Sequence, residues 1–277
     1  MAKLSQLLKE TSERFQAAGI ETPAVDAELL FGHHLGISRG ELQAMSLLDS
    51  DVEVTPALSE MILKREARVP LQHITGKAPF RNLLLEVGPG VFVPRPETES
   101  VVDIALKAIS NKPKAKVLDI GTGSAAIAIS IATESGASVT AVEKSETATA
   151  FARRNIDNFA PQVELLAGDF RELDLGFGVY DLVVSNPPYI PLSAIPKDVE
   201  VREHDPDLAL YGGEDGLDLI RDIIENATYL LAPGGHLVLE HADGQSDAVC
   251  ELLLGNWQKV TAHQDATGRY RAVSAVR

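Results

Sequence analysis

An amide, two prolines and a tyrosine, Asn186-Pro187-Pro188-Tyr189, directly follow an apolar run at residues 180–185. The run is typical of a buried parallel strand, and open α/β sheets bind ligands at the carboxyl ends of such strands. The Asn186 oxygen can accept a hydrogen bond from a planar NH2 group, and the prolines hold the Pro187 carbonyl at a fixed angle. Tyr189 adds a flat face for stacking. The motif predicts a site for a planar amide or aromatic amine with a nucleophilic nitrogen, although four such residues alone also suit a simple turn.

A glycine-rich turn lies between a second predicted strand, at residues 116–120, and a predicted buried helix that begins at Ala126. The turn consists of Gly121, Thr122, Gly123, Ser124 and Ala125. Glycines at a strand-to-helix turn allow the backbone to approach a ligand closely. The full dinucleotide fingerprint is absent, and the lack of a G-x-x-x-x-G-K-[ST] sequence excludes a P-loop.

Two further predicted strands end in residues that suit a nucleoside. The strand at 138–142 is followed by Glu143, about 20 residues after the glycine turn, which is the separation expected of a carboxylate that binds ribose hydroxyls. The strand at 163–167 is followed by Gly168, Asp169 and Phe170, an acid and a ring that can frame an adenine. Four successive strand ends therefore carry groups that together indicate a nucleoside ligand.

These motifs, in this order, resemble class I S-adenosylmethionine-dependent methyltransferases that act on nitrogen. Two upstream segments are more specific: PLQHITG at residues 70–76, and VFVPRPETE at residues 91–99. They resemble the HemK/PrmC family, the N5-glutamine methyltransferases of peptide chain release factors. The resemblance extends over essentially the whole chain, and it implies an α/β fold with a Rossmann-like, seven-stranded sheet.

The resemblance also implies S-adenosyl-L-methionine as the cofactor and peptide chain release factors as the protein partners. By this resemblance, the turn at 121–125 lies beside the methionine moiety, Glu143 holds the ribose, and Asp169 and Phe170 flank the adenine. The family commonly has glycine where this chain has Ala125, and often has aspartate where this chain has Glu143. The turn and the ribose contact are therefore expected to differ slightly from those of other members.

The expected mechanism is direct methyl transfer to a glutamine amide, with Asn186 also contributing to the cofactor site. The Asn186 oxygen and the Pro187 carbonyl would accept the two N–H bonds of the amide, and Tyr189 would pack over it. Such contacts orient the nitrogen and stabilise the positive charge that develops on it. The catalytic residues expected are therefore Asn186, Pro187 and Tyr189, and residues 186–189, with Pro188, form the substrate site. No metal site is expected, because the sequence has no His/Cys cluster.

The chain is expected to divide into three parts. Residues 1–75 show helical periodicity without a chemical motif, and the resemblance implies that they recognise the substrate, the alternative being a structural cap. Residues 76–95 are predicted to form a linking β-hairpin, with strands over 80–93 and a turn at Gly88-Pro89-Gly90. Residues 96–277 form the predicted methyltransferase domain, in which a polar loop at 191–213 has the length of a lid. Arg95 is expected to hold a carboxylate or to line the ligand site.

The composition limits the remaining classes of function. A net charge of −15 disfavours non-specific nucleic-acid binding. The sequence has neither a membrane-length apolar run nor a secretory signal, and the single cysteine, Cys250, suits a reducing cytoplasm. We therefore expect a cytoplasmic enzyme with no membrane partner and no direct nucleic-acid contact. Three alternatives stay open: a glutamine methyltransferase of a ribosomal protein, an adenine-N6 nucleic-acid methyltransferase, and a non-catalytic S-adenosylmethionine-binding protein.

Overall fold

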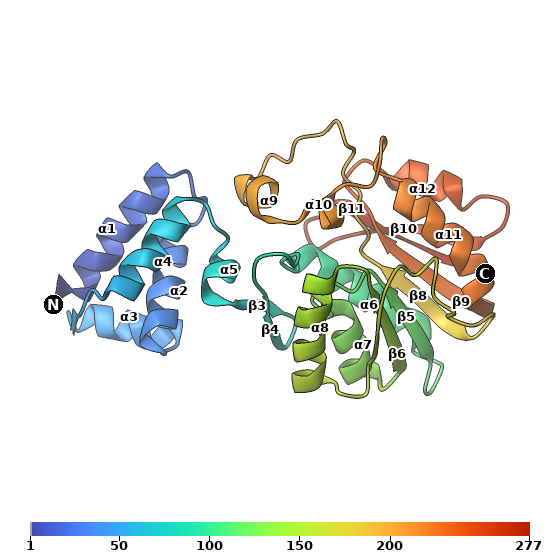
Figure 1. Cartoon of the computed structure of the whole chain (residues 1–277), viewed down its shortest axis with the longest axis horizontal. Helices are drawn as coiled ribbons and strands as arrows, with labels where there is room; N and C mark the ends of the chain where they lie inside the picture. The colour runs from blue at the N-terminus through green and yellow to red at the C-terminus, as the bar shows by residue number, and fades with distance from the viewer. Residues whose placement is uncertain (1) are drawn as a thin grey trace. The chain divides into compact units, whose positions relative to one another are not determined.

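The computed structural model describes residues 2–277 and divides into two compact units (Figure 1). The first unit extends to Lys77 and also includes residues 197–204. The second unit contains residues 78–196 and 205–277. Residue 1, where the predicted first domain began, lies outside the described residues.

The first unit is a bundle of short helices with a small two-stranded sheet. Its elements are β1 (Ala2–Lys3), α1 (Leu4–Ala17), α2 (Pro23–Leu35), α3 (Arg39–Leu47), β2 (Asp51–Val52), α4 (Pro56–Glu66), α5 (Leu71–Thr75) and α9 (Val199–His204). The helical periodicity predicted for this part is confirmed, and residue types that favour helix starts stand at them: Pro23 and Pro56 occupy the first helical turns, and Ser38 forms a capping box with Glu41. The core consists of apolar side chains from these helices, among them Leu4, Phe15, Leu30, Phe31, Leu42 and Leu58.

The two strands that follow this unit lie earlier in the chain than predicted. β3 (Lys77–Phe80) pairs with β4 (Leu83–Glu86), so only two residues join them. A turn is present at the predicted glycines, where the Val91 N–H donates to the Gly88 carbonyl at 3.2 Å, but it follows β4 and does not join the two strands. Gly88 and Gly90 instead allow close packing against α8 (Glu146–Phe159). A Cβ on Gly90 would lie 2.6 Å from Thr147 Cγ2, and one on Gly88 would lie 2.9 Å from Phe151 Cζ. These glycines are needed because two distant segments approach each other closely. The alternation of apolar and polar residues along one segment cannot reveal such a contact.

The second unit is built on a seven-stranded sheet in the order β10-β11-β9-β8-β5-β6-β7, which confirms the predicted α/β architecture. Its strands are β5 (Lys116–Ile120), β6 (Ser138–Glu143), β7 (Glu164–Ala167), β8 (Tyr180–Ser185), β9 (Leu231–Glu240), β10 (Gln258–Gln264) and β11 (Tyr270–Val276). Its remaining helices are η1 (Pro96–Thr98), α6 (Glu99–Ile109), α7 (Ala126–Ser135), α10 (Asp207–Leu210), α11 (Asp218–Leu230) and α12 (Ser246–Leu252). β5 to β9 pair in parallel, whereas β11 runs antiparallel to β9 and β10.

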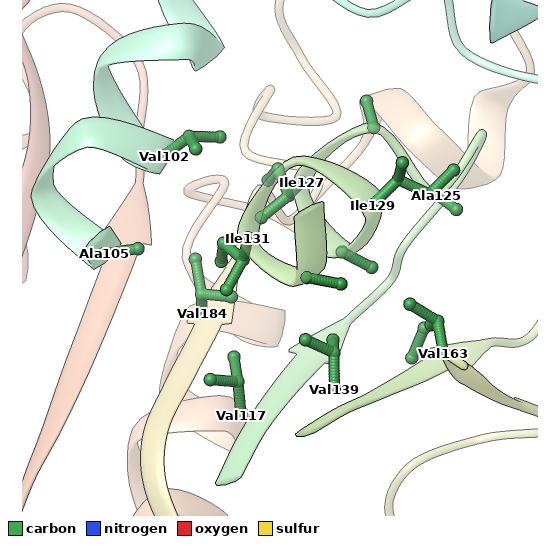
Figure 2. Packing of buried hydrophobic residues seen from close by; sticks show 14 of the residues in the cluster. Val102, Ala105, Val117, Ala125, Ile127, Ile129, Ile131, Val139, Val163 and Val184 are labelled. Atoms are coloured by element: carbon green, nitrogen blue, oxygen red, sulfur yellow. The ribbon is translucent and has the colours of Figure 1, made fainter. Parts of the chain in front are cut away.

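Helices cover both faces of the sheet (Figure 1). Successive side chains of the strands face these two helical layers in turn, as the period of two in a strand requires. Val117 of β5 and Val184 of β8 pack on the side of α6 and α7, and Figure 2 shows both below α7. Leu118 and Val183, their neighbours in sequence, pack on the opposite side with residues of α11 and α12. The predicted helix after the glycine turn is α7, and its first seven residues are all buried. The central strands are therefore buried on both faces, as is usual for parallel sheets.

The prediction that residues 191–213 form one polar loop is wrong. The segment contains α9 and α10, and residues 197–204 belong to the first unit. Within that unit, Glu200 of α9 accepts hydrogen bonds from Arg65 Nη1 at 2.8 Å and Arg68 Nε at 2.7 Å. The proposal that the segment is a lid stays a prediction. None of the helices within residues 2–277 has the length and apolar character needed to cross a membrane.

Candidate functional site

The glycine turn and the Asn-Pro-Pro-Tyr motif begin at neighbouring strand ends. β5 lies between β6 and β8, so the chain moves to one side of β5 and later returns to the other. Ile120, the last residue of β5, is in register with Ser185, the last residue of β8. The Ser185 hydroxyl donates to the Ile120 carbonyl at 2.7 Å and ties the two ends together. Such a topological switch point is where open α/β sheets bind ligands.

The glycine turn has the left-handed backbone that its composition predicts. Gly121 and Gly123 have φ values of 71° and 58°, and a Cβ on either would meet no atom within 4 Å. Their backbone therefore borders open space, as a ligand cradle requires. Ala125 adopts φ 67° although it is not glycine, at a cost on the order of 1–2 kcal/mol. The departure from the family's usual glycine thus falls on a position that is genuinely strained.

Glu143 holds the glycine turn with the carboxylate that was predicted to bind ribose. Its Oε2 accepts from the backbone N–H of Gly123 and its Oε1 from that of Ser145, both at 2.8 Å. Each carboxylate oxygen has a second acceptor position, so a pair of hydroxyls can still bind. The predicted ribose contact therefore fits the geometry, whereas the additional hydrogen bond from Gly123 could not be predicted from the sequence.

The Asp169 carboxylate accepts more hydrogen bonds from the protein than its predicted role at the adenine requires. Arg171 donates to it through its backbone N–H at 3.1 Å, Nε at 2.9 Å and Nη2 at 2.6 Å, and Lys144 Nζ lies 3.1 Å away. The bonds from Arg171 hold the pKa of this carboxyl far below its usual range. Four donors match the roughly four acceptor positions of a carboxylate, so an adenine amine could bind here only if Lys144 moved. Phe170 is mostly buried in the core, so only part of its ring is available to a ligand.

Asp119, the fourth residue of β5, is a buried acid that the sequence analysis did not assign to the site. Its Oδ2 accepts from the Thr122 hydroxyl at 2.6 Å, whereas Oδ1 has no hydrogen-bond partner among residues 2–277. Burial raises the pKa of this carboxyl to about 7. An unsatisfied acceptor beneath the glycine turn favours a ligand that carries N–H groups or positive charge. The sequence signal was an aspartate inside an otherwise apolar strand.

The side-chain amide of Asn186 is oriented by a residue far away in the sequence. Its Nδ2 donates to the hydroxyl of Thr98 at 3.1 Å, and none of the described residues is hydrogen-bonded to its Oδ1. The amide oxygen is thus left as a free acceptor, as an amide-binding role requires. Thr98 belongs to the VFVPRPETE segment, whose resemblance to the HemK/PrmC family predicted no role for Thr98 in the site.

Tyr189 is held at both its backbone and its hydroxyl. The hydroxyl donates to Glu240 Oε1 at 3.4 Å, and the backbone carbonyl accepts from Gln245 Nε2 at 3.0 Å. Burial, reinforced by the nearby Glu240 carboxyl, raises the pKa of the phenol well above its usual value. Gly216, with φ 80°, must be glycine because a Cβ there would lie 2.3 Å from the Tyr189 carbonyl oxygen. Glu240 and Gln245 are site residues that the sequence analysis missed.

Arg95 binds a carboxylate, one of the two roles expected of it. Its Nη2 donates to Asp205 Oδ2 at 3.0 Å, and its guanidinium lies 5.3 Å from the centre of the Phe92 ring. The Asp205 side chain is only 1% exposed. Asp205 is the residue at which the chain re-enters the second unit, so its ion pair with Arg95 holds that point in place.

Asn155 of α8 is fully buried and links the glycine turn to β4. Its Nδ2 donates to the carbonyls of Ser124 at 3.0 Å and Glu86 at 2.9 Å, and its Oδ1 accepts from the Glu86 N–H at 2.7 Å. We expect Asn155→Leu to lower the free energy of unfolding of the second unit by roughly 2–3 kcal/mol, because three backbone groups lose their partner. Urea unfolding followed by far-UV circular dichroism measures this loss. Asn158→Leu, an exposed change on the same helix, is the control, and equal stabilities would contradict the prediction.

Comparison with known proteins finds two family models that match this chain. Residues 6–76 match the family model of the PrmC N-terminal domain, and residues 83–201 match that of the methyltransferase small domain. The chain is 46% identical over 279 residues to a release factor glutamine methyltransferase from Streptomyces coelicolor, covering 96% of this chain and 95% of that protein. It is 44% identical over 283 residues to one from Mycolicibacterium smegmatis, covering 100% and 99%.

A solved methyltransferase from Pyrococcus furiosus superposes with a TM-score of 0.53 at 21% identity, over 79% of this chain and 96% of that one. That likeness supports the fold, namely the class I methyltransferase fold predicted from the motifs. The full-length identity to the curated relatives is high enough to settle the family. This chain belongs to the family of release factor glutamine methyltransferases.

Proposed function

We propose that this protein transfers a methyl group from S-adenosyl-L-methionine to the side-chain amide nitrogen (N5) of the glutamine in the Gly-Gly-Gln motif of peptide chain release factors. The observation that carries the proposal is the Asn186 amide, whose Nδ2 is bonded to Thr98 so that its Oδ1 is left to accept an N–H bond. Membership of the family supports the substrate class. The substrate class and the single cysteine favour a cytoplasmic location.

The residues around the switch point fit S-adenosyl-L-methionine. The open face of the turn at 121–125 suits its methionine moiety, and the unsatisfied Asp119 oxygen suits its positive charge. Glu143 has two acceptor positions left for the ribose hydroxyls, and we propose that Phe170 borders the adenine, with Asp169 joining only when Lys144 moves. When bound, this cofactor supplies a methyl group that is already activated on a positively charged sulfur.

The protein's task is then to present a weak nucleophile in the correct orientation. A glutamine nitrogen is weak because its lone pair is delocalised into the carbonyl. We propose that Asn186 Oδ1 and the Pro187 carbonyl accept its two N–H bonds, while Tyr189 packs over the amide and Pro188 stiffens the loop. Acceptors in these positions stabilise the positive charge that develops on the nitrogen during transfer.

We expect Glu143→Gln to raise the dissociation constant of the cofactor about 10-fold, with kcat at saturating cofactor nearly unchanged. A glutamine offers one acceptor oxygen where the carboxylate offers two, so either Gly123 or Ser145 loses its bond and the ribose loses an acceptor. Isothermal titration with S-adenosylhomocysteine measures the change. Glu146→Gln, an exposed change nearby, is the control. Unaltered affinity would show that the carboxylate does not contact the ribose.

The proposed function is tested by transfer of labelled methyl groups to purified release factors. The control substrate is a release factor with Gln→Ala in its Gly-Gly-Gln motif. Label on the intact factor alone is the expected result. Label on a ribosomal protein or on nucleic acid, with none on the release factor, would overturn the substrate assignment and leave methyl transfer intact.

A further inference from the structure

Glu240 is a buried acid that no step of the proposed reaction uses. It is the last residue of β9, and 1% of it is exposed. Its Oε1 accepts a hydrogen bond from the Tyr189 hydroxyl at 3.4 Å, whereas Oε2 has no hydrogen-bond partner within the described part of the chain. A buried carboxyl with an unsatisfied oxygen is costly, so its presence beside the Asn-Pro-Pro-Tyr motif calls for an explanation.

Thr98 connects this acid to the substrate-binding amide. Its hydroxyl accepts from Asn186 Nδ2 at 3.1 Å, and it lies near enough to the Glu240 carboxyl to lower the pKa of that group. A hydroxyl has one proton to donate, and the neighbouring carboxyl is the group positioned to accept it. Glu240 therefore accepts directly from Tyr189, and it is a neighbour of the hydroxyl that accepts from Asn186.

We propose that Glu240 is a positioning residue that fixes the direction of this hydrogen-bond chain and thereby the orientation of the Asn186 amide. The proposal rests on the proposed function of Asn186 as the acceptor for the substrate amide. An ionised carboxylate can only accept, so Thr98 and Tyr189 must both donate to it. Thr98 then has only acceptor capacity left for Asn186, which must turn its NH2 group to Thr98 and its oxygen to the substrate.

Protonation of Glu240 would remove this control. A protonated carboxyl can donate to Thr98, whose own proton is then free to bond to the Asn186 oxygen. The amide could flip and present its NH2 group to the substrate, where N–H would face N–H and no bond could form. The long contact between Tyr189 and Glu240 is consistent with a chain that tightens when the substrate binds.

Ionisation of Glu240 falls within an accessible pH range. Burial, together with the smaller effect of the Glu97 carboxylate, raises the pKa of its carboxyl to about 7 against the lowering effects of Thr98, Arg271 and Tyr189. These are the groups that face it from η1, from β11 and from the loop after β8. Because the carboxylate is the competent form, activity should rise with pH through about 7.

The first test reads the Asn186 amide without any substrate. Selective 15N-asparagine labelling gives side-chain NH2 signals, and the Asn186 pair is identified by its absence in Asn186→Ala. We expect this pair to shift between pH 5.5 and 8.5 with an apparent pKa of about 7. The shift should persist in Thr98→Ser, which keeps the hydroxyl, and vanish in Glu240→Gln and Thr98→Val. A titration that is the same in all four proteins would overturn the proposal.

The second test measures methyl transfer to the release factor. We expect Glu240→Gln and Thr98→Val to lower kcat about 10-fold, with S-adenosylhomocysteine affinity unchanged and the rise of kcat/KM through pH 7 abolished. Thr98→Ser should restore both rate and pH profile, and Glu225→Gln, an exposed change on α11, should match the original protein. An unaltered rate and profile in Glu240→Gln would overturn the positioning role. If the original protein fails to methylate the factor, the proposed function is wrong, and the amide titration still decides the role of Glu240.

Discussion

Asn186→Ala should lower kcat at least 100-fold while the dissociation constant of the cofactor changes by no more than about threefold. The Asn186 oxygen is the acceptor that the Thr98 bond leaves available, and we place it against an N–H bond of the substrate glutamine. Its effect grows as positive charge develops on the nitrogen, so its loss acts on the transition state more than on binding. Steady-state methyl transfer and titration with S-adenosylhomocysteine separate these two quantities.

Two further variants sharpen this test. Asn186→Asp keeps an acceptor but places a negative charge beside Thr98, whereas Asn158→Ala removes an exposed asparagine of the second unit as a control. We expect the control to match the original protein in rate and affinity. A variant Asn186→Ala that loses cofactor affinity while keeping kcat would mean that the residue serves the cofactor rather than the substrate amide.

Arg65→Met should lower the stability of the first unit by about 3–5 kcal/mol, the largest stability loss we expect in this unit. Arg65 donates to Asp26 Oδ2 at 2.7 Å and to Glu200 Oε1 at 2.8 Å, and all three side chains are nearly buried. Removing the shared cation leaves the Asp26 carboxylate buried without a positive partner, with only the Thr22 hydroxyl still donating to it at 2.8 Å. Glu200 would retain only Arg68. Hydrogen exchange of the α2 and α4 amides measures the stability of this unit by itself.

The pH dependence of this cluster follows from Glu200. Burial alone would raise the pKa of its carboxyl, but hydrogen bonds from Arg68 and Arg65 outweigh burial and lower it well below the ordinary value of 4.5. A group with a lowered pKa contributes fully above its unfolded pKa and loses that contribution as the pH falls towards the folded value. The stabilisation should therefore be complete above about pH 5 and decline in acid.

An exposed ion pair in the same unit provides the matched control. Arg14 donates to Glu66 at 2.5 Å, but nearly half of the Arg14 side chain is exposed, so Arg14→Met should cost at most about 1 kcal/mol. The double variant Asp26→Leu with Arg65→Met should recover much of the loss, because an apolar pair replaces a buried ionic one. Equal effects of Arg14→Met and Arg65→Met would contradict the role assigned to burial.

Features that depend on neighbouring residues could be predicted from the sequence. Apolar runs predicted β5, β6, β7 and β8 to within one residue, because the alternation and length of a strand are local properties. The motifs at the strand ends also predicted where a ligand would bind, because parallel strands place their carboxyl ends on one edge. The left-handed turn at 121–125 followed from its glycines.

The distant groups that complete the site could be identified only from the folded chain. Thr98 lies 88 residues before Asn186, and Glu240 lies 51 residues after Tyr189, so neither contact leaves a local pattern. The close packing of Gly88 and Gly90 against α8 likewise joins distant segments, whereas the glycines alone predicted a hairpin turn. Local rules fix the conformation of a segment, whereas side-chain orientation and the satisfaction of buried polar groups depend on partners that the fold alone brings within hydrogen-bonding distance.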